Sequence, residues 1–387
     1  MARIAIVGAG FSGSVIAREL AERGYEIELF ESRPHLAGNC HTARDPETGV
    51  MLHVYGPHIF HTSNEQVWAY IQKFGKFMPF INRVKAHAKG CVYSLPVNLM
   101  TINQLFGKQL SPAEAQEFVA SLGDKSITDP QTFEEQALRF VGREIYEAFF
   151  RGYTRKQWGV EPSALPASIL KRLPVRFNYD DNYYASKYQG IPVEGYTAII
   201  ERMLDHPGIK IHLATAFTRA MAQDFRHVFY SGPIDSWFDY VEGQLGYRTL
   251  DFKLSRHDGD YQGNAVINYC GEDVPWTRIA EHKHFAPWEQ HEKTIISHEH
   301  SRLCGRDDTP YYPLRLVNDK ALLERYVAQA RAEQGVTFVG RLGTYRYLDM
   351  HVTIEEALNT AKVFLDAVDG DGDGNGKMPA FCVDPLV

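Results

Sequence analysis

The sequence predicts an α/β fold in which a discontinuous Rossmann-like domain carries an inserted helical lobe and an antiparallel-sheet domain. Residues 3–31 read as a strand, a glycine turn, a helix and a second strand. A helical pattern then covers residues 99–158. From residue 225 to 315, short aromatic and β-branched segments such as HVFYSG, RTLDFKL and AVINYC recur between turns, which favours a largely antiparallel sheet.

The chain returns to helix after this sheet. Residues 321–334 read as a helix, VTFVGRLG as a strand and a turn, and 353–368 as a final helix that packs on the first domain. We therefore expect four parts. They are a nucleotide-binding domain of residues 1–65, 194–240 and 335–368, a helical lobe of 98–165, a sheet domain of 66–97, 166–193 and 241–334, and a flexible tail of 369–387.

The opening unit has the pattern of a dinucleotide site. Gly8, Gly10 and Gly13 form a GxGxxG turn between a buried apolar strand and a helix. Gly8 permits the tight turn, Gly10 lets a pyrophosphate approach the backbone at the positive end of the helix, and Gly13 lets helix and strand pack closely. Glu31 ends the second strand, where a carboxylate accepts hydrogen bonds from ribose hydroxyls, which favours FAD or NAD over NADP.

Composition limits the class of protein. The chain of 387 residues is longer than one hydrophobic core usually serves, so we expect more than one domain. The net charge of −7 argues against nucleic acid as a partner. No apolar run is long enough for a membrane span, and the first strand leaves no room for a signal peptide, so we expect a cytoplasmic protein. The odd number of cysteines and the lack of a CxxC pair predict reduced thiols without a zinc site. The cysteines are Cys40, Cys91, Cys270, Cys304 and Cys382.

Two segments outside the nucleotide unit have local signatures. Thr132 and Glu135 are spaced as a capping box before an amphipathic helix. Its apolar stripe, which we interpret as helix-packing core, is Phe133, Ala137, Phe140, Val141, Ile145 and Phe149. The DGDGDGNG run near the C-terminus imitates an EF-hand loop with Asp369, Asp371, Asp373 and Gly374. Because Ala380 stands at the twelfth position in place of a glutamate, we favour a disordered tail over a calcium site.

Histidines and arginines supply the other candidates. His58 and His61 stand in the segment VYGPHIFHT, and neither has a cysteine or carboxylate ligand nearby in the sequence, so we expect no metal. The segment 149–184 gathers aromatic residues around Arg172 and Arg176. Guanidinium groups with aromatic faces suit a diphosphate ligand that carries a base, although solvated arginines over ordinary packing fit the same composition. A second such cluster at Trp276–Arg278 favours the ligand.

Further motifs extend over most of the chain and identify a family. They are GAGFSG, AGNCH, VYGPHIFHT, RVKAHAKGCVYSLPVNL, DPQTFEEQALRF, GYTRKQWG, LPASILKRLPVRFNYDDNYY, VFYSGPID, LGYRTLDF, DVPWTRIAEHKHF, PYYPLR and FVGRLGTYRYLDM. Together they closely resemble the bacterial UDP-galactopyranose mutases from the N-terminus to about residue 368. The resemblance implies a homodimeric, FAD-dependent isomerase that interconverts UDP-galactopyranose and UDP-galactofuranose without net redox change. In that reaction N5 of the reduced flavin attacks the anomeric carbon as UDP leaves.

The resemblance also implies roles for residues. Arg172 and Arg278 match the two arginines that bind the diphosphate, Arg172 lies in a mobile loop, and His61 is set against the flavin. The implied substrate contacts are Asn82, Tyr153, Thr154, Trp158 (uracil), Tyr183, Tyr184, Asn268, Tyr312 and Tyr347. The implied FAD contacts are Gly8, Gly10, Ser12, Gly13, Glu31, Asn39, His58, Arg341, Asp349 and Met350.

Two positions depart from the family pattern. Ala37 replaces the first glycine of the usual Gly-Gly-Asn, and His41 stands where an aromatic residue is common, which puts the geometry near the flavin in doubt. Two other functions fit parts of the sequence. An amine-oxidase-type flavin oxidoreductase shares the GxGxxG start and the discontinuous domain, and a flavoprotein that binds a sugar nucleotide without turnover would keep the same arginines.

Overall fold

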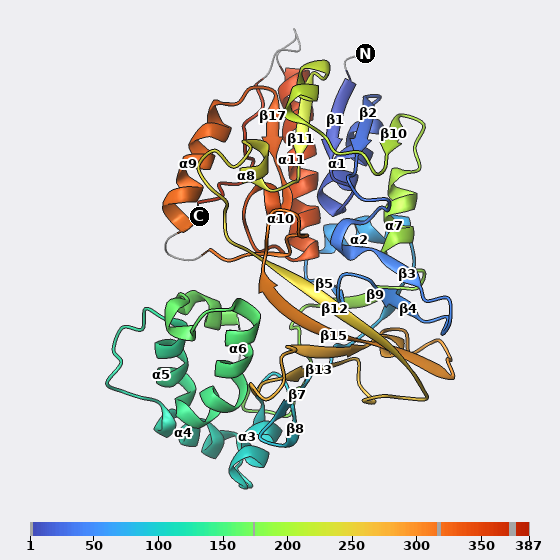
Figure 1. The fold of residues 1–387 in the computed structure, drawn as a ribbon. Coiled ribbons are helices and arrows are strands. Elements are labelled where there is room, and N and C mark those ends of the chain that lie inside the picture. Colours follow the sequence, from blue (N-terminus) through green and yellow to red (C-terminus); the bar gives the residue numbers. More distant parts are fainter. Residues whose placement is uncertain (1–2, 173–174, 316–318, 371–376, 387) are drawn as a thin grey trace.

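The computed structural model describes residues 3–172, 175–315, 319–370 and 377–386. A nucleotide-binding domain forms one end of the molecule, a long antiparallel sheet runs from it, and a helical lobe lies at the other end (Figure 1). The predicted fold class, with its discontinuous Rossmann-like domain, inserted helices and antiparallel sheet, is confirmed.

Five parallel strands form the sheet of the nucleotide-binding domain, in the order β10-β2-β1-β11-β17. The strands alternate between two faces: Ile4 and Ile6 pack with helices α1, α7 and α11, whereas Ala5 packs with α8 and α9. HVFYSG contributes the inner strand β11, parallel to β1. The expectation from its composition, an antiparallel sheet, was wrong, whereas the range 194–240 expected for the nucleotide-binding domain includes this segment. The bounds are β1 Arg3–Val7, α1 Phe11–Ala21, β2 Glu26–Phe30, α7 Gly195–Leu204, β10 Ile209–His212, β11 His227–Tyr230, α8 Ile234–Trp237, α9 Asp319–Ala332, β17 Val336–Phe338, α10 Gly340–Gly343 and α11 Met350–Gly370.

Seven strands form the long sheet, in the order β16-β12-β15-β14-β13-β7-β8. All neighbours are antiparallel except β13 and β7. The register places Arg278 of β14 directly between Asn268 of β13 and Glu299 of β15. The bounds are β7 Lys85–Ala88, β8 Cys91–Ser94, β12 Tyr247–Asp258, β13 Val266–Tyr269, β14 Arg278–Glu281, β15 Lys293–Leu303 and β16 Tyr312–Pro313.

Smaller elements join the two sheets. Strands β5, β9 and β6 form a three-stranded antiparallel sheet, and β3 and β4 form a separate pair. Helix α2 packs into the core of the nucleotide-binding domain through Val67, Tyr70 and Ile71, although its residues were expected in the sheet domain. The bounds are β3 Thr42–Arg44, β4 Met51–His53, β5 Phe60–Thr62, α2 Glu65–Ile71, β6 Phe77–Pro79 and β9 Tyr188–Pro192.

The helical lobe consists of α3, α4, α5, a π-helical turn and α6. The predicted capping box is present: Glu135 N donates to Thr132 Oγ1 at 3.2 Å, and Thr132 N donates to the Glu135 carboxylate at 3.0 Å. The predicted stripe was wrong at Phe140, which is 55% exposed. Gly142, at φ 77°, interrupts the helix near this position. The bounds are α3 Leu99–Phe106, α4 Pro112–Leu122, α5 Phe133–Ile145, the π-helical turn Tyr146–Phe150 and α6 Arg151–Trp158.

The C-terminal residues 377–386 return to the nucleotide-binding domain. Ala380 O accepts a hydrogen bond from Phe338 N of β17, and the rings of Phe338 and Phe381 stack with centroids 5.5 Å apart. This stretch, expected within a flexible tail, is therefore packed. Asp371, Asp373 and Gly374 of the EF-hand-like run lie outside the described residues. Among the helices that the structure describes, none is long and apolar enough to cross a membrane.

Candidate active site

A cavity of about 470 Å³ opens where strands β1 and β2 end and α1 begins. This edge of an open parallel sheet is where such folds bind ligands. Of the expected cofactor contacts, eight line the cavity, whereas Gly13 packs beneath the turn and Asp349 lies with His61 and His351. The eight are Gly8, Gly10, Ser12, Glu31, Asn39, His58, Arg341 and Met350.

The three glycines of the turn differ in what surrounds them. Gly8 has φ +100°, and a Cβ there would lie 2.1 Å from Ser231 Oγ. A Cβ on Gly13 would lie 2.0 Å from the backbone oxygen of Gly8. A Cβ on Gly10 would meet no described atom within 4 Å, so the space above Gly10 is open to a ligand. These surroundings fit the roles inferred from the spacing, with open space only at the position of closest phosphate approach.

Glu31 lies at the end of β2 and lines the cavity. Its side chain is buried, and its carboxylate accepts hydrogen bonds from Ala9 N and Arg33 N, both at 3.0 Å. These bonds hold the carboxylate at the rim of the turn, where a ribose would lie.

Ala37 occupies a backbone conformation that suits glycine. It has φ 73° and ψ 5°, its side chain is buried, and its N–H donates to Ala9 O at 2.9 Å. An L-residue in this left-handed region costs about 1 kcal/mol relative to glycine. Gly38 follows at φ 54°, and a Cβ there would lie 3.2 Å from Gly10 Cα. The turn at Ala37 and Gly38 therefore packs directly against the glycine turn of residues 8–13.

We expect Ala37→Gly to raise stability, because glycine adopts the left-handed conformation without strain, although it gains freedom in the unfolded chain. Loss of the buried methyl group offsets part of this effect, so the net gain is at most about 0.5 kcal/mol, measured as an increase in the urea midpoint. Ala43→Gly on strand β3 is the control, since that residue lies in regular strand and glycine there lowers stability. A fall in midpoint for Ala37→Gly equal to that of the control would contradict the strain.

The histidines of this region are all engaged. His41 stacks on His35 with ring centroids 3.9 Å apart, and its Nδ1 lies 3.0 Å from Thr197 Oγ1. His58 Nδ1 lies 2.8 Å from Gly56 O, and burial lowers the pKa of His58 to about 4. His58 therefore lines the cavity as a neutral ring at neutral pH.

Arg278 is the central charge of a second group of residues. Its Nε donates to Glu299 Oε2 at 2.7 Å, and Glu299 is buried. Burial opposes the charged form, but the neighbouring Glu299 raises the pKa of Arg278 well above its usual value. Burial raises the pKa of the phenols of four expected substrate contacts, and the charge of Arg278 opposes this rise in each, so the four side chains lie near it. They are Tyr153, Tyr183, Tyr184 and Tyr312.

Arg341 connects this group to the cavity. It lines the cavity, and its guanidinium lies 5.6 Å from the ring centroid of Tyr312 and 5.1 Å from that of Tyr347. The two tyrosine rings stack on each other at 5.3 Å. Arg341 Nη2 also donates to Leu348 O at 2.6 Å, which holds the guanidinium in place. The cavity and the tyrosine group are thus adjacent parts of one site.

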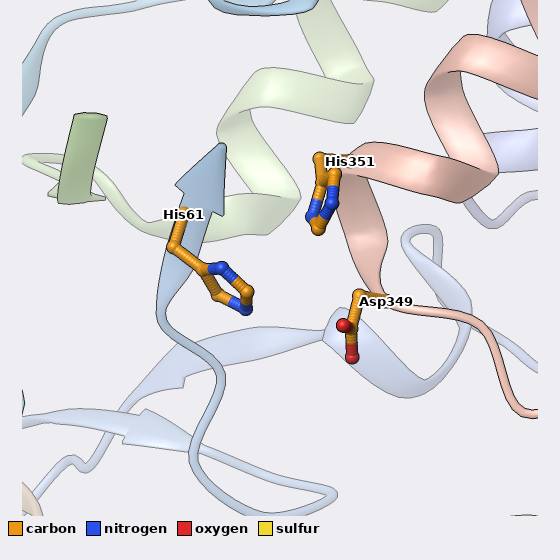
Figure 2. A group of neighbouring side chains, drawn as sticks. All are labelled: His61, Asp349 and His351. Atoms are coloured by element: carbon orange, nitrogen blue, oxygen red, sulfur yellow. The ribbon is translucent and has the colours of Figure 1, made fainter. Parts of the chain in front are cut away.

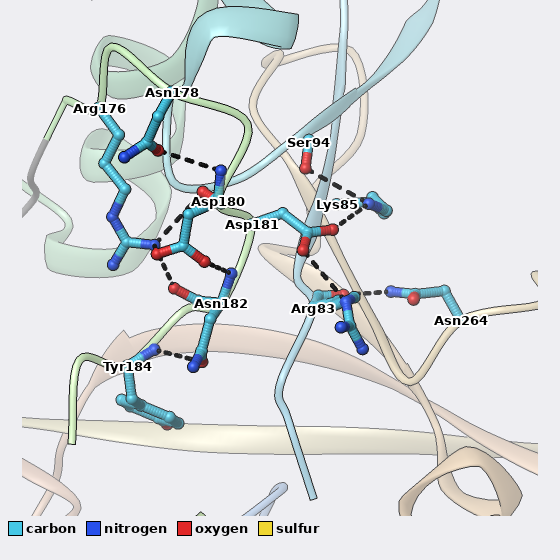
Figure 3. Close-up of polar contacts among 10 residues, drawn as sticks. All are labelled: Arg83, Lys85, Ser94, Arg176, Asn178, Asp180, Asp181, Asn182, Tyr184 and Asn264. Carbon is cyan, nitrogen blue, oxygen red and sulfur yellow. Dashed lines mark hydrogen bonds and ion pairs between the residues drawn. The ribbon is translucent and has the colours of Figure 1, made fainter. Parts of the chain in front are cut away.

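Tyr184 follows a segment whose residues are fixed by several polar contacts (Figure 3). Asp181 accepts from Arg83 Nε at 3.1 Å and from Lys85 Nζ at 3.4 Å, which ties the segment to β7. Arg176 donates to Asp180 Oδ2 at 3.0 Å and to Asn182 O at 2.5 Å. Arg176, singled out in the sequence as a possible phosphate contact, therefore holds its own loop.

Buried amides complete the site. Asn82 O accepts from Tyr183 N at 2.9 Å, and Asn82 Oδ1 is buried without a hydrogen-bond partner among the described residues. A buried oxygen without a partner costs free energy, so it marks a position where a ligand can donate. Asn268 is buried beside Arg278 in the sheet register.

Three expected substrate contacts, Tyr153, Thr154 and Trp158, lie on α6. Thr154 is buried, and Trp158 packs against the apolar core of the helical lobe. Arg172 ends the 3-10 helix Ala167–Arg172, and its side chain lies outside the described part of the chain.

Sequence reasoning missed Glu299 and Lys156. Lys156 Nζ donates to Tyr269 O and to Trp276 O, both at 2.8 Å, and so fixes α6 against the turn before Arg278. Glu299 lies opposite Arg278 only because β14 pairs with β15 in this register. Neither contact has a signal in the linear sequence.

The fold and the site define a class: a Rossmann-type dinucleotide-binding protein with a half-buried arginine and tyrosine side chains beside its cofactor cavity. A model of the NAD(P)-binding Rossmann-like domain matches residues 6–74, and the model described as UDP-galactopyranose mutase matches residues 148–347. The chain belongs to the UDP-galactopyranose mutase family, and membership implies a flavin cofactor and a UDP-sugar substrate.

Individual relatives agree with this assignment. The chain is 59% identical to the probable UDP-galactopyranose mutase of Klebsiella pneumoniae, over 98% of each protein. It is 52% identical to the dTDP-fucopyranose mutase of Escherichia coli, over 94% of this chain and 99% of that protein. A crystal structure of reduced UDP-galactopyranose mutase, 16% identical, superimposes with a TM-score of 0.74 over 96% of each chain, which shows the same fold.

Proposed function

We propose that the protein is an FAD-dependent isomerase that interconverts UDP-galactopyranose and UDP-galactofuranose without net redox change. The observation that carries this proposal is Arg278, a half-buried cation with tyrosine side chains near it beside a dinucleotide cavity. Its guanidinium can stabilise the charge that a departing diphosphate develops. The Klebsiella relative, which is 59% identical over 98% of each protein and is named as a probable UDP-galactopyranose mutase, supports the choice of substrate.

The residues of the cavity fit FAD. The open space above Gly10 suits the pyrophosphate, and Glu31 suits an unphosphorylated ribose. When bound and reduced, FAD supplies a nucleophilic N5 for the anomeric carbon of the sugar. We propose that the eight residues lining the cavity hold it and that His61 faces the flavin.

The chain itself binds and orients the sugar nucleotide. We propose that Arg278 and Arg172 neutralise the diphosphate, with Arg172 swinging inward from its loop when substrate binds. Tyr312 and Tyr347 lie beside the diphosphate, and Trp158 supports the uracil ring. The remaining proposed contacts are Asn82, Tyr153, Thr154, Tyr183, Tyr184 and Asn268.

Two further features of the protein are proposals from the resemblance. We propose a homodimer and a cytoplasmic location. The alternative of an amine-oxidase-type oxidoreductase is not favoured, because both the family model and the relatives with the highest identity reported above are mutases.

We expect the FAD-loaded protein to convert UDP-galactopyranose after reduction with dithionite and to show little conversion when oxidised. Separation of the two sugar nucleotides by chromatography measures the reaction. A parallel assay with dTDP-fucopyranose tests whether the protein prefers the UDP-sugar, since the Escherichia coli relative is named for the dTDP-sugar. Equal conversion by oxidised and reduced protein would contradict the proposed role of the flavin, and no conversion in either state would favour a binding protein without turnover.

A further inference from the structure

Two imidazoles and a carboxylate come together beside the cofactor cavity. They belong to His61 on β5, Asp349 before α11 and His351 in the first turn of α11 (Figure 2). One possible ligand atom from each residue lies within 4.8 Å of those of the other two. The rings of His61 and His351 have centroids 5.1 Å apart. Two imidazoles that share one tetrahedral zinc ion, at about 2.1 Å from each nitrogen, have centroids about 5 Å apart.

The ring of His61 is held by one polar contact and one stacking contact. Its Nδ1 lies 3.0 Å from Ser186 Oγ, and its ring stacks on Tyr184 with centroids 3.8 Å apart and planes at 13°. When Nδ1–H donates to this hydroxyl, the lone pair is on Nε2, the form that binds a metal.

The cluster lies beside the dinucleotide cavity and outside its lining. Leu348 and Met350 line the dinucleotide cavity, whereas Asp349 and His351, which alternate with them along the chain, meet His61. Three protein ligands with an exposed carboxylate leave coordination positions open to water or to another ligand. The nearby cation Arg278 is paired with Glu299, which offsets its charge.

We propose that His61, Asp349 and His351 form a binding site for a divalent transition-metal cation, with Zn²⁺ as the probe. No metal was expected from the sequence, because no further ligand stands near His61 in it. The fold brings two possible ligands, Asp349 and His351, to His61 from the start of α11. The cation would lie beside Tyr184, so under the proposed function it would inhibit the enzyme. Binding itself does not depend on that function.

Isothermal titration of Zn²⁺ into tag-free, FAD-loaded protein tests the site. We expect saturable binding that weakens at least 10-fold in His351→Gln, which removes a ligand. Ser186→Ala keeps all three ligands but loses the hydrogen bond to Nδ1, and we expect a 10-fold to 100-fold loss. Binding should also weaken as the pH falls, because protonated imidazoles cannot bind a metal.

The matched control is His284→Gln, in the separate group of Asp260, Glu281 and His284. We expect unchanged affinity in that variant, and the flavin absorbance verifies that each variant is folded and loaded. The proposal is overturned if the unmodified protein shows no saturable binding, if His351→Gln binds with the same affinity, or if His284→Gln loses the binding. Each result is independent of whether the mutase assay succeeds.

Discussion

Arg278→Ala is expected to lower the turnover number of the reduced enzyme 100-fold to 1,000-fold while the protein stays yellow. The guanidinium lies outside the lining of the dinucleotide cavity, so its loss leaves the FAD contacts intact. What is lost is a fixed positive charge where the diphosphate departs. Removal of one preorganised donor of this kind costs about 3–4 kcal/mol of transition-state stabilisation. Turnover of UDP-galactopyranose under dithionite measures the loss, and the visible absorbance of the oxidised protein reports the bound flavin.

A loss of folding must be separated from a loss of charge. Arg278→Ala leaves Glu299 buried without its partner, which lowers stability because a buried carboxylate needs a counter-charge. The double variant Arg278→Ala with Glu299→Gln removes that penalty, and we expect it to regain melting temperature but no turnover. Arg278→Lys keeps the charge without the planar fork, so its turnover is expected to lie between those of Arg278→Ala and the unmodified enzyme. Near-normal turnover in the double variant would show that the diphosphate binds elsewhere.

The parts of the fold that were predictable are those with local signals. The buried apolar strand, the GxGxxG turn and the acid at residue 31 follow one another along the chain, and the structure places Gly8, Gly10 and Glu31 around one cavity. The capping box of Thr132 and Glu135 is equally local and forms as expected. By contrast, HVFYSG has the composition of any strand, and only its partner β1 decides that it is parallel.

The site was less predictable where it depends on pairing between distant segments. Arg278 was identified by motif, but its counter-charge Glu299 depends on the register of β14 with β15. Arg176 looked like a phosphate contact by composition, yet it binds Asp180 and Asn182 of its own loop. Asp349 comes together with His61 and His351, which stand on two different elements, and no local pattern places the three side by side. Such contacts have no signature in a single sequence.

Gly13→Ala is expected to prevent formation of the holoprotein. A Cβ at this position would lie 2.0 Å from Gly8 O and 2.9 Å from Ile6 Cγ2. Neither neighbour can move without cost, since one is backbone of the glycine turn and the other is fully buried in the parallel sheet. We expect a loss of at least about 3 kcal/mol, at the upper end for an overpacked core, measured as a fall in melting temperature with loss of bound flavin.

Gly10→Ala separates the fold from the ligand. Gly10 has φ −81°, which alanine adopts freely, and a Cβ there meets no described atom within 4 Å. The protein stripped of FAD should therefore melt at the same temperature as the unmodified apoprotein. The new methyl group instead occupies the space that a pyrophosphate would approach, so FAD should bind more weakly and raise the melting temperature less. Unchanged FAD affinity in Gly10→Ala would mean that the phosphates do not approach this turn, and the cofactor site would have to be placed elsewhere.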